Sequence, residues 1–260
     1  MPNSILVFIP TYNERENVMK IYERISNLKL PLDILFIDDN SPDGTGAVLD
    51  LINKPDVFVI HRSGKLGIGS AHKDGIAWAY SHGYSQLITM DSDFLHRPED
   101  IPAMMEQSKN SDIVVASRFI RNDSLQEWDT WRKFLTITGH TITRRLLNIP
   151  YDITGAFRLY KIDRIPRDLF EKTASNGYSF FPESMNIMNR NGIHISEIPV
   201  ILPKRTYGNS KLKFKDMVQW FLFIATLGFR NIFSKEDILP KTNRNNNNTT
   251  EPDFPGKEQL

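Results

Sequence analysis

The sequence predicts an α/β protein whose central sheet is mostly parallel and is covered by helices on both faces. Short continuous runs of apolar, branched residues alternate with segments of helical spacing up to about residue 120. Continuous runs of this length are typical of strands that are buried on both sides. Two of the runs lead directly into clusters of acidic residues, where the ends of neighbouring strands would meet.

Each predicted element follows from its own pattern. The expected strands cover residues 5–9, 34–37, 57–60, 87–90, 113–116, 153–160 and 193–200. Helices are expected around 18–25, from 47, over 71–82 and over 217–229, with a further loop and helix in the basic and aromatic stretch 120–150. Residues 1–215 would form a catalytic domain, 216–240 an apolar or amphipathic helical region, and 241–260, rich in Asn and charge, a disordered tail.

Composition excludes several classes of function. A net charge of +1 over 260 residues argues against broad nucleic-acid binding, so no nucleic-acid partner is expected. The absence of cysteine excludes disulfides, thiolate metal sites and a cysteine nucleophile. The first residues enter a strand without the pattern of a signal peptide, and no apolar run reaches the roughly 20 residues of a spanning helix. We therefore expect a cytoplasmic protein.

The two acidic clusters predict a metal and phosphate site. Asp38 and Asp39 follow one predicted strand, and Asp91 and Asp93 follow another. Ligands of open α/β sheets bind beyond the carboxyl ends of the strands, so these carboxylates are expected to converge. Their mutual repulsion is costly unless a cation or donor groups neutralise it, and a divalent ion such as Mg²⁺ or Mn²⁺ carrying a phosphorylated ligand is the natural neutraliser. Asp39 is placed to accept a hydrogen bond from a nucleotide base or ribose.

Glycines and arginines add weaker signals. Gly64, Gly67 and Gly69 mark a loop that bends sharply or approaches a ligand, but their spacing is neither that of a dinucleotide fold nor that of a P-loop. A dehydrogenase or an NTPase is therefore not expected. Arginines can hold phosphate oxygens through two parallel hydrogen bonds. The candidates are Arg118, Arg132, Arg158 and Arg205.

An ordered series of short stretches resembles the family 2 glycosyltransferases of GT-A fold, and within them the polyprenyl-phosphate (dolichol-phosphate) mannosyltransferases. The resemblance covers roughly residues 4–230. It rests on IPTYNE at 9–14, DDNSPDGT at 38–45, HR at 61–62, KLG at 65–67, MDSD at 90–93, ASR at 116–118, DITGAFRLY at 152–160, GYSF at 177–180 and RTYGNSKL at 205–212.

This resemblance implies a reaction and its residues. The reaction is inverting transfer of mannose from a nucleoside-diphosphate sugar to a polyprenyl monophosphate, with GDP-mannose as the expected donor and UDP-glucose as the alternative. Asp91 and Asp93 would bind Mg²⁺ or Mn²⁺ and, with Arg118, Arg132 and Arg205, form the catalytic set. The implied substrate-binding residues are Pro10, Tyr12, Glu14, Asp38, Asp39, Lys65, Arg158, Ser210 and Lys211.

One departure and one open question accompany the resemblance. Leu95 stands where the family usually has a polar residue that often binds the metal, so either the metal site is one ligand short or His96 or water substitutes. A polyprenyl phosphate resides in a bilayer, which implies a protein lying on the cytoplasmic face of a membrane. The segment 217–229, flanked by basic residues, fits either an amphipathic anchor in the membrane interface or a helix packed under the sheet.

Three other functions remain compatible with parts of the sequence. A family 2 transferase that uses a glycan hydroxyl as acceptor would need a carboxylate base, and Asp152, Glu183 and Asp129 are available. A signalling receiver domain also places acidic residues after parallel strands, but it leaves the basic second half of the chain unused. A transferase-like binding protein without turnover is suggested only by Leu95.

Overall fold

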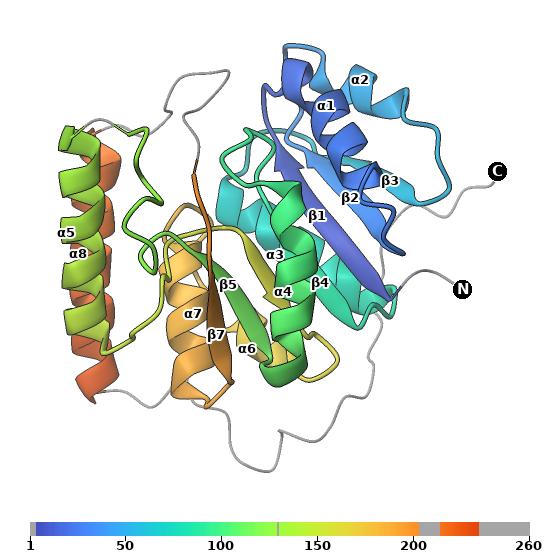
Figure 1. Ribbon diagram of the computed structural model, residues 1–260. Coiled ribbons are helices and arrows are strands. Elements are labelled where there is room, and N and C mark those ends of the chain that lie inside the picture. The colour runs from blue at the N-terminus through green and yellow to red at the C-terminus, as the bar shows by residue number, and fades with distance from the viewer. Residues whose placement is uncertain (1–3, 129, 203–213, 234–260) are drawn as a thin grey trace.

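The computed structural model describes residues 4–128, 130–202 and 214–233, and it confirms the predicted α/β architecture. A sheet of seven strands has the order β3-β2-β1-β4-β6-β5-β7. Every neighbouring pair is parallel except those that involve β6, which runs antiparallel to β4 and β5. The strands are β1 Ile5–Thr11, β2 Asp33–Asp38, β3 Val57–His61, β4 Gln86–Thr89, β5 Ile113–Ser117, β6 Arg158–Tyr160 and β7 Ile195–Pro199 (Figure 1).

Helices pack on both faces of the sheet, as the sequence predicts. They are α1 Arg15–Ser26, α2 Thr45–Asp50, α3 Ile68–Ser81, α4 Ile101–Gln107, α5 Thr130–Leu147, α6 Arg167–Glu171, α7 Phe180–Arg190 and α8 Phe214–Phe233, with short 3₁₀ turns at Pro98–Asp100 and Ser108–Asn110. The sequence analysis did not foresee α4, α6 and α7. Nearly all of α7 is buried, including its polar residues Glu183, Ser184 and Asn186, so these residues do not mark a solvent face.

One predicted strand is wrong over most of its length. Of residues 153–160, only Arg158–Tyr160 pairs in the sheet. The preceding segment is held by a side chain instead, because Asp152 accepts hydrogen bonds from the backbone and hydroxyl of Thr154 and from the guanidinium of Arg118. A side chain that binds its own backbone two residues on favours a turn over a ladder.

The two faces of the sheet carry separate apolar cores. Because side chains alternate along a strand, Phe8 and Leu35 pack with α3, α6 and α7, whereas Ile9 and Phe36 pack with α1 and α4. The two cores hold the carboxyl ends of β1, β2 and β4 side by side. This end of the sheet, here called the carboxyl rim, is where the predicted site residues lie.

Helices α5 and α8 lie side by side beyond β7, at one end of the sheet (Figure 1). The inner face of α8 is buried through Ile224 and Leu227. Asn231 exchanges two side-chain hydrogen bonds with Asn186 of α7, at 2.8 and 3.0 Å, which fixes α8 to α7. The inner face of α8 is therefore packed, while Phe221, Leu222 and Phe229 on its outer face are exposed.

The core also contains a neutral histidine. His72 of α3 lies among the rings of Phe8, Phe180 and Phe181, and its Nε2 has no hydrogen-bond partner. Burial, and secondarily the charge of Arg158, lower the pKa of His72 from 6.5 to about 3. Below about pH 6.5 His72 therefore binds a proton in the unfolded chain but stays neutral in the folded chain. The free energy of unfolding consequently decreases as the pH falls below about 6.5.

We predict that His72→Phe flattens this acid dependence. Between pH 7.5 and pH 5 the free energy of unfolding of the wild-type protein should decrease by about 2 kcal/mol more than that of the variant. The estimate holds because pH 5 lies about 1.5 units below the pKa of His72 in the unfolded chain, and each unit contributes about 1.4 kcal/mol. Urea unfolding at the two pH values measures the difference. His194→Phe, at an exposed histidine, is the control and should keep the wild-type slope; parallel slopes for the wild type and His72→Phe would contradict the assignment.

Candidate active site

The carboxyl rim brings together the acidic residues that the sequence singled out. Strand β1 lies between β2 and β4, so Asp38 and Asp39 at the end of β2 and Asp91 and Asp93 beyond β4 leave the same rim two strands apart. Parallel strands are about 4.8 Å apart, which separates the two acidic groups by about 10 Å. This is a length that a single nucleoside diphosphate can span.

Asp39 is held by a buried ion pair. Nη1 of Arg62 donates to Oδ1 of Asp39 at 2.6 Å, and both side chains are almost fully buried. The second oxygen, Oδ2, has no hydrogen-bond partner among the described residues. Asp39 is therefore fixed in one orientation with one oxygen left to accept a hydrogen bond from a ligand.

Asp38 is occupied within the loop. Its Oδ1 accepts hydrogen bonds from the hydroxyls of Ser41 and Thr11, and its Oδ2 accepts the backbone N–H of Ser41. With 2 % of the residue exposed, Asp38 shapes the rim and does not open onto it. Its predicted contact with substrate has no support in this arrangement.

The loops after β1 and β3 supply the other predicted donor-site residues. The ammonium of Lys65 lies 4.2 Å from the ring centre of Tyr12, a cation–π contact. The backbone N–H of Glu14 donates to the hydroxyl of Thr45, which ties the start of α1 to the loop after β2. Pro10 is buried within β1, where it is the register partner of Ile37. The Tyr12 ring and the Lys65 ammonium thus form a cation–π pair, here called the Tyr12–Lys65 wall, at the same rim as Asp39.

Asp91 and Asp93 follow β4 in a tight turn. The Asp91 side chain is 35 % exposed, whereas Asp93 is nearly buried and its Oδ1 accepts the backbone N–H of Leu95. Phe94, directly after Asp93, has a positive φ of 62°. Two carboxylates two residues apart are hard oxygen ligands suited to Mg²⁺ or Mn²⁺.

The structure explains why Leu95 is not a ligand. Its side chain packs against the apolar cluster of Leu125, Trp128 and Leu202. Nδ1 of His96 accepts the backbone N–H of Asp91 at 2.9 Å, so that nitrogen is already engaged. Within the described residues, no group of three or more Asp, Glu or His side chains could hold a metal alone. A bound ion would therefore need diphosphate or water oxygens besides Asp91 and Asp93.

Arg118 belongs to a buried polar network next to this turn. Its Nε and Nη2 donate to the two carboxylate oxygens of Asp152, both at 2.9 Å, and Nη2 also donates to Thr154. Burial alone would raise the pKa of Asp152, but the charge and hydrogen bonds of Arg118 outweigh it and hold that pKa well below its usual range. Arg118 is thus already paired and fixed in orientation. The charge of Asp152, and to a smaller extent that of Asp91, raises the pKa of the Arg118 guanidinium.

Two further titratable groups border the network. Oε1 of Glu197, on β7, accepts the backbone N–H of Asp152 at 2.7 Å, and burial raises the pKa of Glu197. His140 of α5 stacks on Phe119 at 3.7 Å between ring centres, and burial lowers its pKa. Strand β7 and helix α5 therefore border the network with titratable side chains whose neutral forms burial favours.

Arg158 does not reach the rim. It is fully buried, and it donates to the carbonyls of Ile153 and Phe181 and to the hydroxyls of Tyr160 and Ser184. No carboxylate among the described residues pairs with it. Its predicted role in holding phosphate does not fit this position, and its contacts instead join β6 to α7.

The glycine loop approaches another part of the chain rather than a ligand. A Cβ on Gly67 would lie 2.4 Å from the carbonyl oxygen of Asn176, and one on Gly69 would lie 2.7 Å from Cβ of Phe180. The backbone N–H of Ser70 also donates to the Asn176 carbonyl. These glycines allow α3 to begin against the segment that precedes α7.

Four predicted residues cannot be placed at the site. Arg132 lies in α5, but its side chain is outside the described part, as are all of Arg205, Ser210 and Lys211. Their assignments remain predictions.

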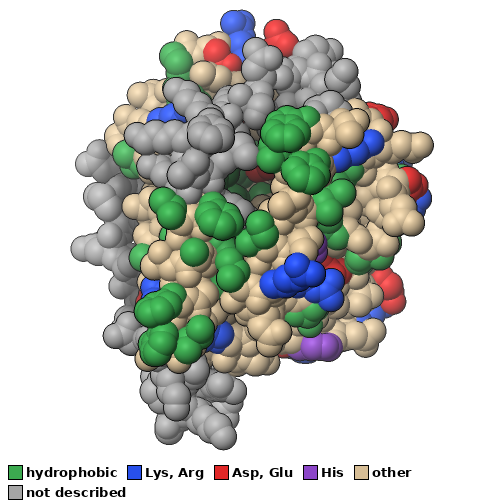
Figure 2. Space-filling model, turned by 90° about the vertical axis from the view of Figure 1, so that its left-hand side faces the viewer, with side chains coloured by type: hydrophobic (Ala, Val, Ile, Leu, Met, Phe, Trp, Pro, Cys, Tyr) green, Lys and Arg blue, Asp and Glu red, His purple; other side chains and the backbone are tan. Residues whose placement is uncertain are grey.

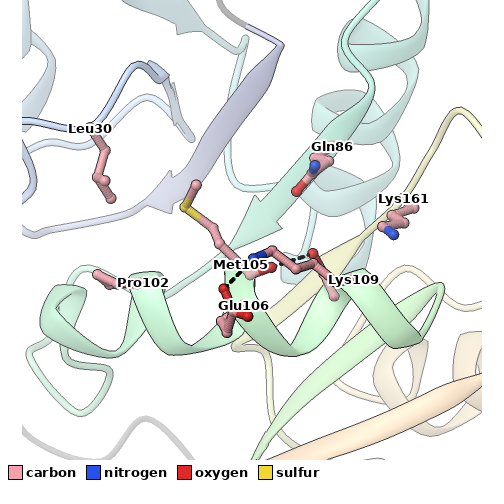
Figure 3. A pocket seen from close by; sticks show the side chains of 8 residues that line it. Leu30, Gln86, Pro102, Met105, Glu106, Lys109 and Lys161 are labelled. Carbon is pink, nitrogen blue, oxygen red and sulfur yellow. Dashed lines mark hydrogen bonds and ion pairs between the residues drawn. The ribbon is translucent and has the colours of Figure 1, made fainter.

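Two surface hollows lie away from the carboxyl rim. One, of about 470 Å³, is lined by α4, the start of β4 and Lys161, and Figure 3 shows its Glu106–Lys109 ion pair of 2.6 Å. The other, of about 550 Å³, is lined by α1 and the start of β2. Both are at the amino ends of these strands and lack the convergent carboxylates, so neither replaces the rim as the candidate site.

The fold and the rim define a class, an α/β protein that gathers acidic residues at the carboxyl ends of its strands. The profile of the family described as "Glycosyl transferase family 2" matches residues 6–165, well over half of the chain. The chain therefore belongs to glycosyltransferase family 2, which confirms the resemblance noted from its motifs and excludes a receiver domain.

Two relatives in sequence are similar over most of the chain. Polyprenol monophosphomannose synthase of Mycolicibacterium smegmatis is 34 % identical over 230 residues, which cover 86 % of this chain and 87 % of the relative. Undecaprenyl-phosphate mannosyltransferase of Micrococcus luteus is 34 % identical over 211 residues, 80 % of this chain and 87 % of the relative.

Solved structures show the fold. Mannosyl-3-phosphoglycerate synthase of Rubrobacter xylanophilus superimposes with a TM-score of 0.64 at 15 % identity, over 92 % of this chain and 77 % of that one. The mannosyltransferase PcManGT of Pyrobaculum calidifontis, in complex with GDP-Man and Mn²⁺, gives 0.58 at 17 % identity, over 88 % and 65 %. The GT-A architecture expected from the resemblance is thereby confirmed.

Arg62 is the site residue that the sequence analysis left without a role. It lies directly after a predicted strand, within a stretch of the family resemblance, and it contacts Asp39. A basic residue immediately after a parallel strand was the available signal, since it must leave the sheet at the same rim as the acidic clusters.

We predict that Asp152→Asn destabilises the fold strongly. The substitution leaves the Arg118 guanidinium largely buried without its counter-charge, and breaking such a pair typically costs about 3–5 kcal/mol. The midpoint of urea unfolding measures the loss. Asp123→Asn is the matched control, because Asp123 pairs with Arg121 in an exposed position and should change stability little. Equal effects of the two substitutions would contradict the importance of the buried pair.

Proposed function

We propose that this enzyme transfers mannose from GDP-mannose to a polyprenyl monophosphate, with inversion at the anomeric carbon. One observation carries the proposal: Asp39 and the Asp91–Asp93 turn leave the same rim two strands apart, which strand spacing converts to about 10 Å. The relatives named for polyprenyl-phosphate mannose transfer supply the sugar and the acceptor.

The donor would lie across β1. Its base would contact Asp39 and the Tyr12–Lys65 wall, and its diphosphate would reach the turn of Asp91 and Asp93. The half-exposed carboxylate of Asp91 and the adjacent Asp93 fit Mg²⁺ or Mn²⁺ as ligands. When bound, the ion would neutralise charge that develops on the leaving diphosphate. The neighbour solved with GDP-Man and Mn²⁺ supports both choices.

The described carboxylates favour a phosphate acceptor over a glycan hydroxyl. A hydroxyl acceptor needs a general base, whereas a phosphate monoester is already an anion near neutral pH. Asp152 is a poor base because Arg118 holds its pKa low, and Glu183 is buried in α7, where it accepts the backbone N–H of Ser175. Asp129 lies outside the described residues. A further carboxylate of this region, Glu197, already accepts a backbone hydrogen bond.

The chain's own groups would act by position and charge. Attack by the acceptor phosphate from the side opposite the diphosphate forms the new C1–O bond as the old one breaks, which inverts the configuration. Arg118, already fixed by Asp152, would orient a phosphate beside Asp91. Arg132 and Arg205 are proposed to hold the acceptor phosphate, and Ser210 and Lys211 to assist.

The exposed apolar side chains of α5 and α8 suit an acceptor that resides in a bilayer. The outer sides of α5 and α8 expose large apolar residues, and Figure 2 shows such side chains gathered on this face. They are Trp131, Phe134, Ile137 and Leu146 on α5 and Phe221, Leu222, Phe229, Ile232 and Phe233 on α8. Among the helices of the described residues, none combines the length and apolarity needed to cross a membrane.

We propose that this α5–α8 face lies in the interface of the cytoplasmic leaflet. Exposed apolar patches of this kind mark interaction sites, and an apolar helix face enters the boundary between headgroups and acyl chains without spanning the bilayer.

A donor and acceptor screen tests the proposed function. Purified enzyme with Mn²⁺ is given GDP-mannose, UDP-glucose and other nucleotide sugars, each with a short-chain polyprenyl phosphate or with a mannose oligosaccharide. We expect a mannosyl-phosphate lipid from GDP-mannose, and the β anomer by NMR from the α-linked donor. Transfer to the oligosaccharide alone would show a glycan hydroxyl acceptor, and transfer from UDP-glucose alone would overturn the donor.

We predict that Asp93→Asn lowers turnover at least about a hundredfold without unfolding the protein. The amide keeps the size of the side chain but removes the charge that a divalent ion requires. Turnover is measured across a Mn²⁺ titration, and thermal unfolding reports the fold. Asp50→Asn, at an exposed aspartate paired with His61, is the matched control and should keep wild-type turnover. Undiminished activity of Asp93→Asn would refute the metal assignment.

We predict that Phe229→Ser combined with Ile232→Ser reduces binding to vesicles at least about tenfold. Both side chains are exposed on α8, and each apolar side chain transferred from water contributes about 1.5–3 kcal/mol when fully buried. Co-sedimentation with phosphatidylcholine–phosphatidylglycerol vesicles measures binding, and thermal unfolding checks the fold. Leu51→Ser removes an equally exposed apolar side chain after α2 and should bind like wild type; equal losses would refute the α5–α8 face.

A further inference from the structure

One guanidinium ties together three segments of the carboxyl rim. Arg62 follows β3, and its Nη1 donates to Asp39 after β2 at 2.6 Å. Its Nε lies 3.1 Å from Oδ2 of Asp74 on α3, and its Nη2 donates to the hydroxyl of Ser70, also on α3. The Arg62 side chain is only 6 % exposed. All three sides of its planar fork are therefore occupied.

Backbone hydrogen bonds also hold the segment around Asp39 in place. The N–H of Arg62 donates to the carbonyl of Asp38 at 2.8 Å, and the N–H of Asp39 donates to the carbonyl of Thr11 at 3.0 Å. The ends of β1, β2 and β3 are thus in register at Asp39. With its main chain held by β1 and its Oδ1 held by Arg62, the Asp39 carboxylate has little freedom to rotate, and Oδ2 keeps a set direction.

The position of Asp39 favours the nucleobase over the phosphates as its ligand. It lies about two strand spacings, or about 10 Å, from the Asp91–Asp93 turn. A nucleoside diphosphate whose phosphates lie at that turn extends its base farthest from it. The nearby Tyr12 ring, held under Lys65, provides an aromatic surface of the kind on which a base stacks.

We propose that Arg62 is a positioning residue that makes Asp39 select the donor's base. An ionised carboxylate only accepts hydrogen bonds, so its aimed Oδ2 suits the ring N–H of guanine or uracil and disfavours the unprotonated ring nitrogen of adenine. Arg62 itself touches no substrate, and it acts by fixing which oxygen faces the base. The inference rests on the proposed function, because it assumes a nucleotide at the rim.

Nucleotide binding by the full chain tests this role without turnover. Dissociation constants for GDP, UDP and ADP are measured with Mn²⁺ by calorimetry. The wild-type protein should bind GDP or UDP at least about tenfold more tightly than ADP, the size expected for a hydrogen bond to a charged group. In Arg62→Gln the preference should shrink to about twofold, although the variant still binds nucleotides.

Further variants separate aiming from general damage. Arg62→Lys keeps the charge but cannot make the three contacts of the guanidinium. The ratio of the ADP to the GDP dissociation constant should fall about threefold in this variant. The same ratio tests the inference if Arg62→Gln fails to fold. Asp39→Asn should lose the preference, and Asp39→Asn with Arg62→Gln should lose no more than either single variant. Arg164→Gln, at an exposed arginine paired with Asp112, is the matched control and should keep the preference.

The outcomes distinguish this inference from the proposed function. A wild-type protein that binds no nucleoside diphosphate refutes the donor site, and the role of Arg62 falls with it. A selective wild type whose folded Arg62→Gln variant keeps the full preference overturns the inference and leaves the donor site standing. Loss of the preference in Asp74→Asn, which leaves the Arg62–Asp39 bond in place, would also overturn it, since it would show dependence on the network as a whole.

Discussion

The convergence of negative charge at one end of the sheet is the constraint on which the rest of the structure depends. Parallel strands deliver their carboxyl ends to the same rim, and unpaired carboxylates there would repel one another. The fold meets this demand residue by residue, since Ser41 and Thr11 satisfy Asp38, Arg62 pairs with Asp39, and Arg118 pairs with Asp152. The turn of Asp91 and Asp93 is the part of the rim best suited to a metal ion.

These pairings also position the cations. Arg118 and Arg62 are each held by a carboxylate, so both guanidinium groups are fixed before any ligand arrives. In the proposed function Arg118 is thereby fixed near the diphosphate before a donor binds, and a preorganised charge stabilises a leaving group without having to reorient. Arg62 acts on Asp39 instead, so the buried pairs that stabilise the rim also set the directions of Arg118 and of the Asp39 carboxylate. Helices α5 and α8 lie beyond β7, so an apolar face and a charged rim occur on one molecule.

Much of the fold and part of the site followed from the sequence. Apolar runs such as 34–37 and 113–116 predicted strands correctly because burial on both faces leaves an unmistakable local pattern. The strand expected over 153–157 did not form, since the deciding contact, from Asp152 to Arg118, joins residues 34 positions apart. Arg158 and the glycines were expected to contact a ligand, but in the structure they pack against the segment around α7. The sequence does not show which distant part of the backbone will lie next to a given residue.

A crystal of the protein soaked with Mn²⁺ and GDP tests the central claim most directly. Anomalous scattering at the manganese edge locates the ion, and the density of the nucleotide locates the base. The account predicts the ion within about 2.2 Å of a carboxylate oxygen of Asp91 or Asp93, bound also to the diphosphate, with the base beside Asp39. An ion bound elsewhere, or a nucleotide lying away from the carboxyl ends of β1, β2 and β4, would contradict it.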